Sequence, residues 1–339
     1  MMNTPKKILI IRTKSMGDVL LTLPAVHAVR ESYPDAHISF LVDSVNAALL
    51  QGFEDVDEVI ANDRSKLKNP WTAFPEFFKL LYHLRPGRFS LGIDLQGYGE
   101  TAWLLRFSGA KERWGSVYSW GRKWAYTCGV ARRGDLHPAD WNLFLLQQCG
   151  LKIGEIENQF KLPPAALEAA QNLFTKHGLD SSQPTLFIHA FTSRAPKNWP
   201  LDNYLAVAEY WRSKGIQVVF GGGPGDRAPL EPARALGFSV FAGAPLLVSA
   251  GLMKLSTIVL GGDTGMLHLA IALGKPARML IRNVSSGTCD LYQHREWVIP
   301  APVKNEIASL TVDAVIAESG IALETETSET ASFRIVSSQ

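Results

Sequence analysis

Short apolar runs alternate with longer amphipathic stretches along almost the whole chain. Apolar runs flanked by polar turns predict strands, and the stretches between them carry apolar residues at spacings of three and four, which predict helices. Regular alternation of this kind is typical of parallel sheets with helical crossovers. We therefore expect an α/β protein made of two doubly wound, Rossmann-like domains.

Four apolar runs in the first half predict strands at residues 7–12, 37–43, 58–61 and 91–95. The first helix is expected over 17–32, where the apolar residues form one buried face. Those residues are Val19, Leu20, Leu23, Val26 and Val29. Pro24 lies inside this segment, so the helix should kink or restart there, because proline removes a backbone donor.

The second half repeats the alternation. Strands are predicted at 185–190, 216–220, 257–260 and 277–281, and helices at 201–214, 246–255 and 264–273. Gly215 and Gly274 follow two of these helices, where a helix C-terminus favours a residue that adopts the left-handed conformation. Both ends therefore agree with the predicted helix boundaries.

The segment 157–183 contains Pro163 and Pro164 and a connecting helix, and it predicts the boundary between two domains. We expect an N-terminal domain over 1–160 and a C-terminal domain over 161–323, whose last helix can pack back on the first domain. The tail 324–339 is rich in Glu, Thr and Ser and is expected to be disordered.

Composition narrows the class of protein. The chain has 339 residues, of which 46% are hydrophobic, so two domains can each bury a core. The net charge of only +2 does not indicate a nucleic-acid partner. No window is long and apolar enough to span a membrane, and the apolar run 8–11 is too short for a signal peptide. We expect a cytoplasmic protein that at most touches the inner face of the inner membrane peripherally, with Cys128, Cys149 and Cys289 as reduced thiols.

Two matched turns each follow a predicted strand and open a helix. They are the segments 14–18, with sequence KSMGD, and 261–268, with sequence GGDTGMLH. The carboxyl edge of a parallel sheet is where ligand-binding groups usually lie, so two such turns suggest two domains that face each other across a cleft and bring a donor to an acceptor. For Asp18 two interpretations remain open: a helix N-cap or a general base.

The loop 192–200 offers hydroxyls at Thr192 and Ser193, a cation at Lys197 and a following helix N-terminus. These groups suit a diphosphate, although a solvated surface loop has the same composition. The glycine-rich run 221–226, which includes Gly222, could let a nucleotide approach the backbone. It does not have the G-x-G-x-x-G spacing, so a nicotinamide enzyme is disfavoured.

Asp263 and Thr264 open the helix predicted at 264–273, and His268 lies one turn further along. The backbone N–H groups at this turn and the Thr264 hydroxyl could bind phosphate oxygens. Alternatively, Asp263 is only an N-cap and His268 a core histidine. If the turn does bind a nucleotide sugar, Asp263 is expected to contact sugar hydroxyls or orient a neighbour.

The segment 106–133 carries seven basic residues and one acidic residue, interleaved with Trp114, Trp120 and Trp124. It could hold an anionic ligand or rest on an anionic membrane, or its tryptophans could lie in the core. Arg64, Lys66 and Lys68 add charge in another loop. By contrast, the D-x-D sequence at 55–57 is expected to be a solvated turn rather than a metal site.

The segment 12–18 (RTKSMGD), followed by Leu-Pro-Ala at 23–25, resembles the N-terminal signature of the ADP-heptose:lipopolysaccharide heptosyltransferases, glycosyltransferase family nine. The segments 197–200 and 262–265, with His268, fall where that family carries its donor-binding motifs. The resemblance covers most of residues 7–320.

This resemblance implies a GT-B architecture, with the acceptor on the N-terminal domain and a nucleotide sugar on the C-terminal one. It implies inversion at the anomeric carbon with no metal and no cofactor, Asp18 as the base and Lys197 as the cation that neutralises the diphosphate. The acceptor would be the anionic inner core of lipopolysaccharide, built on Kdo and lipid A. The expected donor-binding residues are Thr192, Ser193, Lys197, Gly222, Asp263, Thr264, Gly265 and His268, and the expected acceptor-binding residues are Met16, Gly17, Arg64, Lys68 and Arg122.

The chain departs from the family pattern at 282–287, where RNVSSG replaces a Phe-Gly-Pro-Thr-like loop. ADP-heptose is the leading donor, and another nucleotide sugar stays open. Two other functions also stay open at this point: a nucleotide-sugar epimerase or hydrolase on the same fold, and a sugar-binding protein without catalytic activity.

Overall fold

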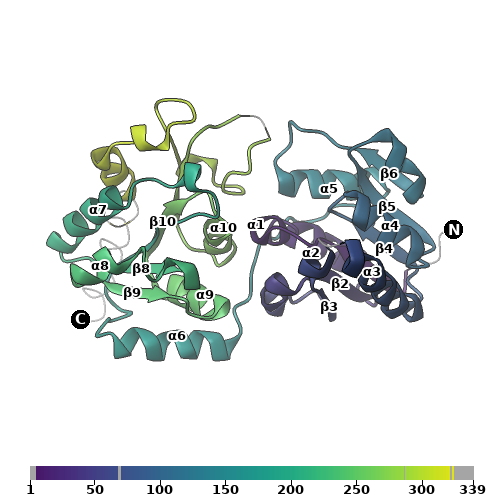
Figure 1. Ribbon diagram of the computed structural model, residues 1–339, viewed down its shortest axis with the longest axis horizontal. Helices are drawn as coiled ribbons and strands as arrows, with labels where there is room; N and C mark the ends of the chain where they lie inside the picture. Colours follow the sequence, from purple (N-terminus) through teal and green to yellow (C-terminus); the bar gives the residue numbers. More distant parts are fainter. Residues whose placement is uncertain (1–4, 68–69, 286, 321–322, 324–339) are drawn as a thin grey trace, which may run out of the picture. The chain divides into compact units, whose positions relative to one another are not determined.

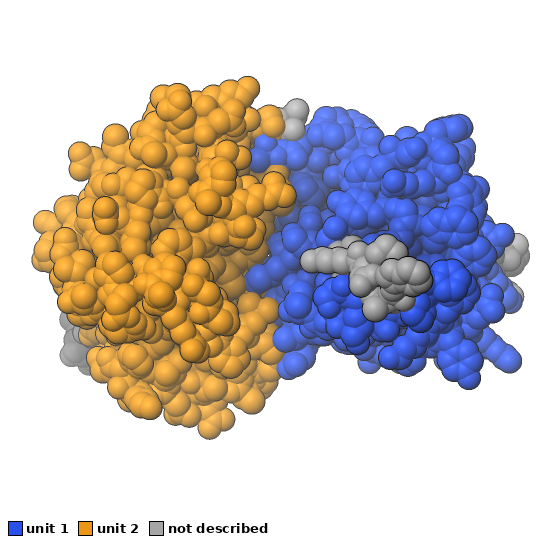
Figure 2. All heavy atoms as spheres, in the orientation of Figure 1, with its two compact units in different colours: residues 1–161, 286–288 blue, residues 162–285, 289–339 orange. Residues whose placement is uncertain are grey.

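The structure, a computed structural model, describes residues 5–67, 70–285, 287–320 and 323 (Figure 1). The chain divides into two compact units, residues 1–161 with 286–288 and residues 162–285 with 289–339 (Figure 2). Each unit is a six-stranded parallel sheet with flanking helices. The predicted disordered tail lies outside the described residues.

Unit 1 has the strand order β3-β2-β1-β4-β5-β6, and each neighbouring pair is parallel. Its strands are β1 (Lys7–Ile11), β2 (His37–Asp43), β3 (Glu58–Asn62), β4 (Leu91–Asp94), β5 (Glu112–Val117) and β6 (Cys128–Ala131). Its α-helices are α1 (Met16–Leu20), α2 (Leu23–Ser32), α3 (Pro70–Leu84), α4 (Gly99–Phe107) and α5 (Pro138–Gln148), and its 3-10 helices are η1 (Ser44–Gly52), η2 (Arg64–Leu67), η3 (Arg85–Gly87) and η4 (Trp120–Ala125).

The helix predicted over 17–32 is two helices, which confirms the expected restart. Helix α1 ends at Leu20, and α2 begins at Leu23 with Pro24 in its first turn. Proline is tolerated at that position because the first N–H groups of a helix have no intrahelical partner. Val19 and Leu20 of α1 and Val26 and Val29 of α2 are buried, as their spacing predicts.

The basic and aromatic segment 106–133 contains two strands that the sequence pattern did not predict, β5 and β6. Trp114 lies in β5 and is buried, whereas Trp120 and Trp124 of η4 are 75% and 46% exposed. The core interpretation therefore holds for one tryptophan only. The other two reach the surface.

Unit 2 has the strand order β12-β11-β10-β7-β8-β9, the same order as unit 1 when its strands are counted from the first. Its strands are β7 (Thr185–His189), β8 (Gln217–Gly222), β9 (Ser239–Ala242), β10 (Ile258–Gly262), β11 (Ala277–Ile281) and β12 (Val298–Pro300). Its helices are α6 (Pro164–Lys176), α7 (Leu201–Ser213), α8 (Glu231–Ala235), α9 (Leu246–Leu255), α10 (Gly265–Ala272), η5 (Ala195–Lys197), η6 (Pro224–Asp226), η7 (Arg295–Trp297) and η8 (Ile307–Ser309), and residues 312–320 are also helical.

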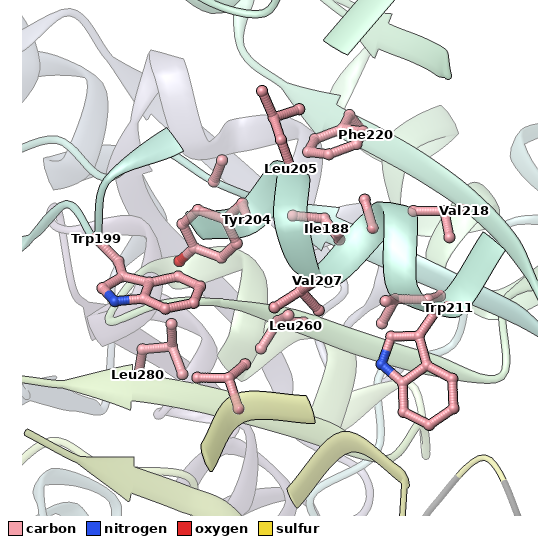
Figure 3. Packing of buried hydrophobic residues seen from close by; sticks show 14 of the residues in the cluster. Ile188, Trp199, Tyr204, Leu205, Val207, Trp211, Val218, Phe220, Leu260 and Leu280 are labelled. Atoms are coloured by element: carbon pink, nitrogen blue, oxygen red, sulfur yellow. The ribbon is translucent and has the colours of Figure 1, made fainter. Parts of the chain in front are cut away.

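The core of unit 2 packs α7 against the sheet (Figure 3). The rings of Trp199 and Tyr204 meet edge to face with centroids 4.9 Å apart, and both are buried. Val315, from the helical segment 312–320, belongs to the same core. The end of the described chain is thus tied into unit 2 by apolar contacts.

Two of the three cysteines form a disulfide, so the prediction of three reduced thiols is wrong. Cys128 begins β6 and Cys149 caps the C-terminus of α5, and their Cα atoms are 5.8 Å apart. The two residues are 21 positions apart in the sequence, so their pairing depends on how α5 returns to the end of β6. Among the described residues, Cys289 forms no disulfide. Among the described residues, no helix is both long enough and apolar enough to cross a membrane.

Candidate active site

Three of the predicted site residues, Asp18, Lys197 and Asp263, lie in loops at the switch points of the two sheets. In unit 1 the chain reverses its direction of winding between β1 and β4, and in unit 2 between β7 and β10. Loops that leave the carboxyl ends of such neighbouring strands diverge and leave room for a ligand. Asp18 follows β1 and Gln96 follows β4, whereas Lys197 follows β7 and Asp263 follows β10.

Asp18 is the third residue of α1 and is held from both sides. Its Oδ2 accepts hydrogen bonds from the Ser15 backbone N–H at 2.9 Å and from the Ser15 hydroxyl at 3.0 Å. Ser15 is the N-cap residue, and Asp18 accepts from its backbone N–H as the third residue of the helix, so Asp18 does cap the helix but from a capping box rather than from the N-cap position. Its side chain is still 33% exposed. The carboxylate is therefore fixed in direction and open to a ligand.

Arg12 links Asp18 to the neighbouring strand. Its Nη2 lies 2.8 Å from Asp18 Oδ1, and its Nη1 donates to the Leu95 carbonyl at 2.5 Å. The Arg12 side chain is only 11% exposed. A planar guanidinium can bind two acceptors in fixed directions, so Arg12 sets the position of the Asp18 carboxylate relative to the end of β4.

A buried network behind Asp18 holds the same two loops together. Gln96 Oε1 accepts from the backbone N–H groups of Thr13 and Lys14, both at 3.2 Å. Asp94 Oδ1 accepts from the backbone N–H groups of Gln96 and Gly97, and its Oδ2 accepts from the Tyr126 hydroxyl at 2.7 Å. Complete burial raises the pKa of Asp94, against these hydrogen bonds, which lower it. The network fixes the loop on which Asp18 depends.

Cations and aromatic rings surround this end of the sheet. The Lys14 ammonium lies 5.1 Å from the centre of the Tyr98 ring, and Arg122 Nη1 donates to the Gly97 carbonyl at 3.3 Å. Arg132 lies over the Trp141 ring, and its pKa is lowered first by burial and then by the charge of Arg12. This edge of unit 1 is thus suited to an anionic ligand.

The predicted acceptor residues are only partly gathered here. Met16 and Gly17 belong to α1 beside Asp18, and Arg122 touches the loop after β4. Arg64 begins η2, and Lys68 lies outside the described residues. Three further residues at this edge, Arg12, Gln96 and Arg132, were not predicted as site residues. A signal for Arg12 was present, since it directly follows β1.

In unit 2, Lys197 and Asp263 form an ion pair. Lys197 Nζ lies 2.5 Å from Asp263 Oδ2, and the two side chains are 27% and 22% exposed. The pair joins the loop after β7 to the loop after β10 across the switch point. An ion pair that solvent can reach can exchange one partner for a charged ligand, which suits a site for a diphosphate.

Thr264 is the N-cap of α10, and its hydroxyl accepts from the Met266 backbone N–H at 3.2 Å. Gly265 is the first residue of the helix. The side chain of His268 is buried, with Nε2 3.6 Å from the Cys289 Sγ. The N-cap interpretation therefore applies to Thr264 rather than to Asp263, and the Thr264 hydroxyl is already used by the helix.

The loop that carries Lys197 is tightly packed against the end of β10. An added Cβ on Gly262 would lie 2.8 Å from Thr192 Cγ2. The Thr192 backbone N–H donates to Asn198 Oδ1 at 2.8 Å, and the buried Trp199 indole donates to the Leu310 carbonyl at 3.1 Å. Lys197 is thus held by contacts on both sides of it in the sequence.

Two further predicted donor-binding residues, Ser193 and Gly222, and the D-x-D sequence of unit 1 complete the comparison with the predictions. Ser193 is exposed in the same loop. Gly222 ends β8, next to β7, and an added Cβ there would meet Asp226. In the D-x-D sequence of unit 1, Asp57 bonds Arg30 and Asp55 bonds His27, so both carboxylates already have protein partners.

Two doubly wound units with this strand order have the GT-B architecture that solved heptosyltransferase structures share. The family model for glycosyltransferase family 9 (heptosyltransferase) matches residues 77–307, and the chain belongs to this family. It is therefore a glycosyltransferase of the heptosyltransferase type, and an epimerase or hydrolase is no longer favoured.

Three similar proteins agree with this assignment. Lipopolysaccharide heptosyltransferase 1 of Escherichia coli O18:K1:H7 (strain RS218 / NMEC) is 24% identical over 324 residues, which cover 91% of this chain and 95% of the relative. The glycosyl transferase family 9 structure from Veillonella parvula DSM 2008 has a TM-score of 0.87 at 20% identity and covers 94% of this chain and 98% of that one. The E. coli heptosyltransferase WaaC with ADP has a TM-score of 0.73 at 22% identity and covers 91% and 97%.

Proposed function

We propose that this protein transfers heptose from ADP-heptose to the inner core of lipopolysaccharide, in the region of Kdo and lipid A, with inversion at the anomeric carbon and without a metal. The observation that carries this function is Asp18, a carboxylate fixed by Arg12 and Ser15 at the switch point of unit 1 and still open to a ligand. The names of the similar proteins support heptose as the sugar and lipopolysaccharide as the acceptor.

In this mechanism Asp18 takes the proton from an acceptor hydroxyl as its oxygen bonds to the anomeric carbon of the donor. The hydroxyl becomes more acidic as that bond forms, so a carboxylate can serve as the base. Ser15 bonds Oδ2 of Asp18 and Arg12 bonds Oδ1, so the acceptor hydroxyl can approach the carboxylate only from the directions that these two residues leave open. Lys14, Arg122 and Arg132 would attract the anionic acceptor to this edge.

The bond from the anomeric carbon to the diphosphate breaks in the same step, and the electron pair leaves with ADP. Lys197 neutralises the charge that develops on the diphosphate, a role that stabilises the transition state. Because Lys197 is paired with Asp263, the diphosphate must either bind Lys197 together with the Asp263 carboxylate or displace that carboxylate from Lys197. Asp263 is then free to accept hydrogen bonds from sugar hydroxyls.

The Asp18→Asn variant tests the base. Transfer should fall to background while ADP binding, assigned to unit 2, stays close to that of the wild type. Ser15→Ala is the matched control, because it removes one hydrogen bond to Asp18 but leaves the carboxylate in place. Transfer by Asp18→Asn at the wild-type rate would rule out Asp18 as the base.

The donor nucleotide is tested by thermal stabilisation with ADP, UDP, GDP and dTDP, since a ligand that binds only the folded state raises the melting temperature. The largest shift should come from ADP, and it should shrink in Lys197→Ala. A larger shift with UDP would contradict ADP-heptose as the donor.

We also propose that the protein is cytoplasmic and touches the inner face of the inner membrane peripherally, because an acceptor that is built on lipid A lies at a membrane.

A further inference from the structure

Residues of helices α3 and α4 of unit 1 line an apolar groove that the proposed reaction does not use. The groove has a volume of about 1200 Å³. Six aromatic side chains line it, together with Leu81 and three charged residues, Lys79, Arg85 and Glu100. The aromatic residues are Phe74, Phe77, Phe78, Tyr82, Trp103 and Phe107.

These rings project outward to an unusual degree for apolar side chains. Tyr82 is 82% exposed, Phe74 70% and Phe78 52%. The rings of Phe74 and Phe78 contact each other with centroids 4.6 Å apart, so the exposed surface is continuous along α3. Folding of unit 1 gains little from residues this exposed, and contiguous exposed apolar surface usually marks a binding site.

The aromatic surface continues from α4 onto η4. The ring of Trp103 stacks on that of Phe107 at 5.2 Å and meets that of Trp124 at 4.7 Å. Next in η4, the Lys123 ammonium lies 4.6 Å from the centre of the Trp120 ring, which is 75% exposed. Tryptophan and tyrosine beside lysine or arginine are typical of protein surfaces that lie at the headgroup level of a bilayer.

The charge of this part of unit 1 indicates which lipids it would bind, because an excess of Lys and Arg favours anionic headgroups. Residues 70–125 contain eight Lys and Arg but four Asp and Glu, and one of the four, Asp94, is buried. Arg85 lines the groove and its Nε donates to the Phe107 carbonyl at 3.4 Å, and Lys79 Nζ lies 4.0 Å from Glu76 Oε1 on the same helix. Burial and then the charge of Arg106, in the last turn of α4, lower the pKa of Arg113, so these two cations interact near the end of that helix.

We propose that the face formed by α3, α4 and η4 docks on an anionic phospholipid bilayer. The aromatic rings enter the headgroup region, and the surrounding cations pair with lipid phosphates. The inference rests on the proposed function in one respect: an acceptor built on lipid A lies at a membrane, and this face would bring unit 1 to it.

Vesicle sedimentation tests the surface without donor or acceptor. Wild-type protein should bind vesicles of equal parts phosphatidylcholine and phosphatidylglycerol, with a blue shift of tryptophan emission, and should bind phosphatidylcholine vesicles more weakly. Phe74→Ser combined with Tyr82→Ser should lower the partition coefficient by about tenfold or more, because two exposed rings no longer enter the interface. Arg85→Gln should lower it by about fivefold.

Tyr210→Ser is the matched control, because Tyr210 is an exposed aromatic residue of α7 in unit 2. It should bind vesicles as the wild type does. Equal binding by the wild type and the Phe74→Ser, Tyr82→Ser variant would overturn the proposal. A dimer that the same two substitutions dissociate, with no vesicle binding by the wild type, would also overturn it and identify a second copy as the occupant.

Transfer to a deacylated, lipid-free acceptor separates this proposal from the proposed function. The Phe74→Ser, Tyr82→Ser variant should transfer to that acceptor at the wild-type rate while it loses vesicle binding. If the variant binds vesicles normally, docking by this face is wrong and the transferase assignment stands. If the wild type binds vesicles but transfers no heptose to any acceptor, the proposed heptose transfer is wrong and docking stands.

Discussion

Arg12 holds Asp18 by one guanidinium nitrogen and the Leu95 carbonyl by another, at 2.8 Å and 2.5 Å. Leu95 follows β4 and Asp18 follows β1, so a single side chain fixes the carboxylate relative to both strands of the switch point. Arg12 touches neither proton nor sugar in the proposed reaction. We therefore regard it as a positioning residue.

The Arg12→Lys variant tests that role. Lysine keeps the charge, but its single ammonium has no fork that can reach both acceptors in fixed directions. The turnover number should fall by about 10- to 100-fold, because misplacing a catalytic group by about 1 Å has effects of this size. The KM for the donor should stay close to that of the wild type, since the donor is assigned to unit 2. A change in donor KM with unchanged kcat would contradict the positioning role.

The Gln96→Leu variant tests the network behind Asp18. It leaves the buried N–H of Thr13 and the half-buried N–H of Lys14 without their acceptor, and a buried unsatisfied group costs about 1–3 kcal/mol. Both the melting temperature and transfer should fall. Thr13→Val is the matched control, because it removes only the 3.4 Å hydroxyl contact to Gln96 and keeps both amide bonds. Equal melting temperatures for the two variants would show that the amide bonds do not hold the loop.

Some strands could be predicted from the sequence because both of their faces are buried. Strands β1, β2 and β7 are continuous apolar runs between polar turns, and their ends were placed within one residue. Three of the four missed strands, β6, β9 and β12, have only three or four residues and lie at sheet edges. An edge strand needs little apolar surface, so its pattern resembles a loop. The fourth, β5, lies inside the sheet, but its sequence mixes charged residues with glycine and so contains no continuous apolar run.

The site residues also fall into some that the sequence predicted and some that it did not. Asp18, Lys197 and Asp263 were identified from local turns that open helices. Gln96 was missed because it is 83 residues from Thr13 in the sequence, and the two residues meet only because β4 pairs with β1. Such contacts depend on strand order, which a single sequence does not reveal.

The close approach at Gly262 predicts a specific effect on the donor site. In Gly262→Ala the new Cβ would lie 2.8 Å from Thr192 Cγ2, so the loop that carries Lys197 must shift. Affinity for ADP, measured by calorimetry, should fall by about tenfold, because overpacking of this kind costs about 1–3 kcal/mol. Gly225→Ala is the control in a neighbouring glycine-rich loop, where an added Cβ meets nothing within 4 Å. Loss of affinity in the control alone would contradict the proposed position of the donor.

His189 predicts how the stability of unit 2 depends on pH. The residue ends β7, and its Nδ1 lies 3.1 Å from the Gly221 carbonyl. Burial lowers the pKa of His189 below the value of 6.5 that it has in the unfolded chain, against the opposing effect of this hydrogen bond. As the pH falls below about 6.5, the unfolded chain therefore takes up a proton that the folded chain does not.

The free energy of unfolding should consequently decrease by up to about 1.4 kcal/mol per pH unit, until the pH reaches the folded pKa. His189→Asn keeps an N–H donor near the Gly221 carbonyl but cannot titrate in this range, so its unfolding free energy should fall less steeply. The variant should be less stable than the wild type near neutral pH, because the smaller side chain leaves a cavity, and the difference should narrow on acidification. Urea unfolding at several pH values, followed by tryptophan fluorescence, measures both slopes. Parallel slopes would show that another group causes the acid sensitivity.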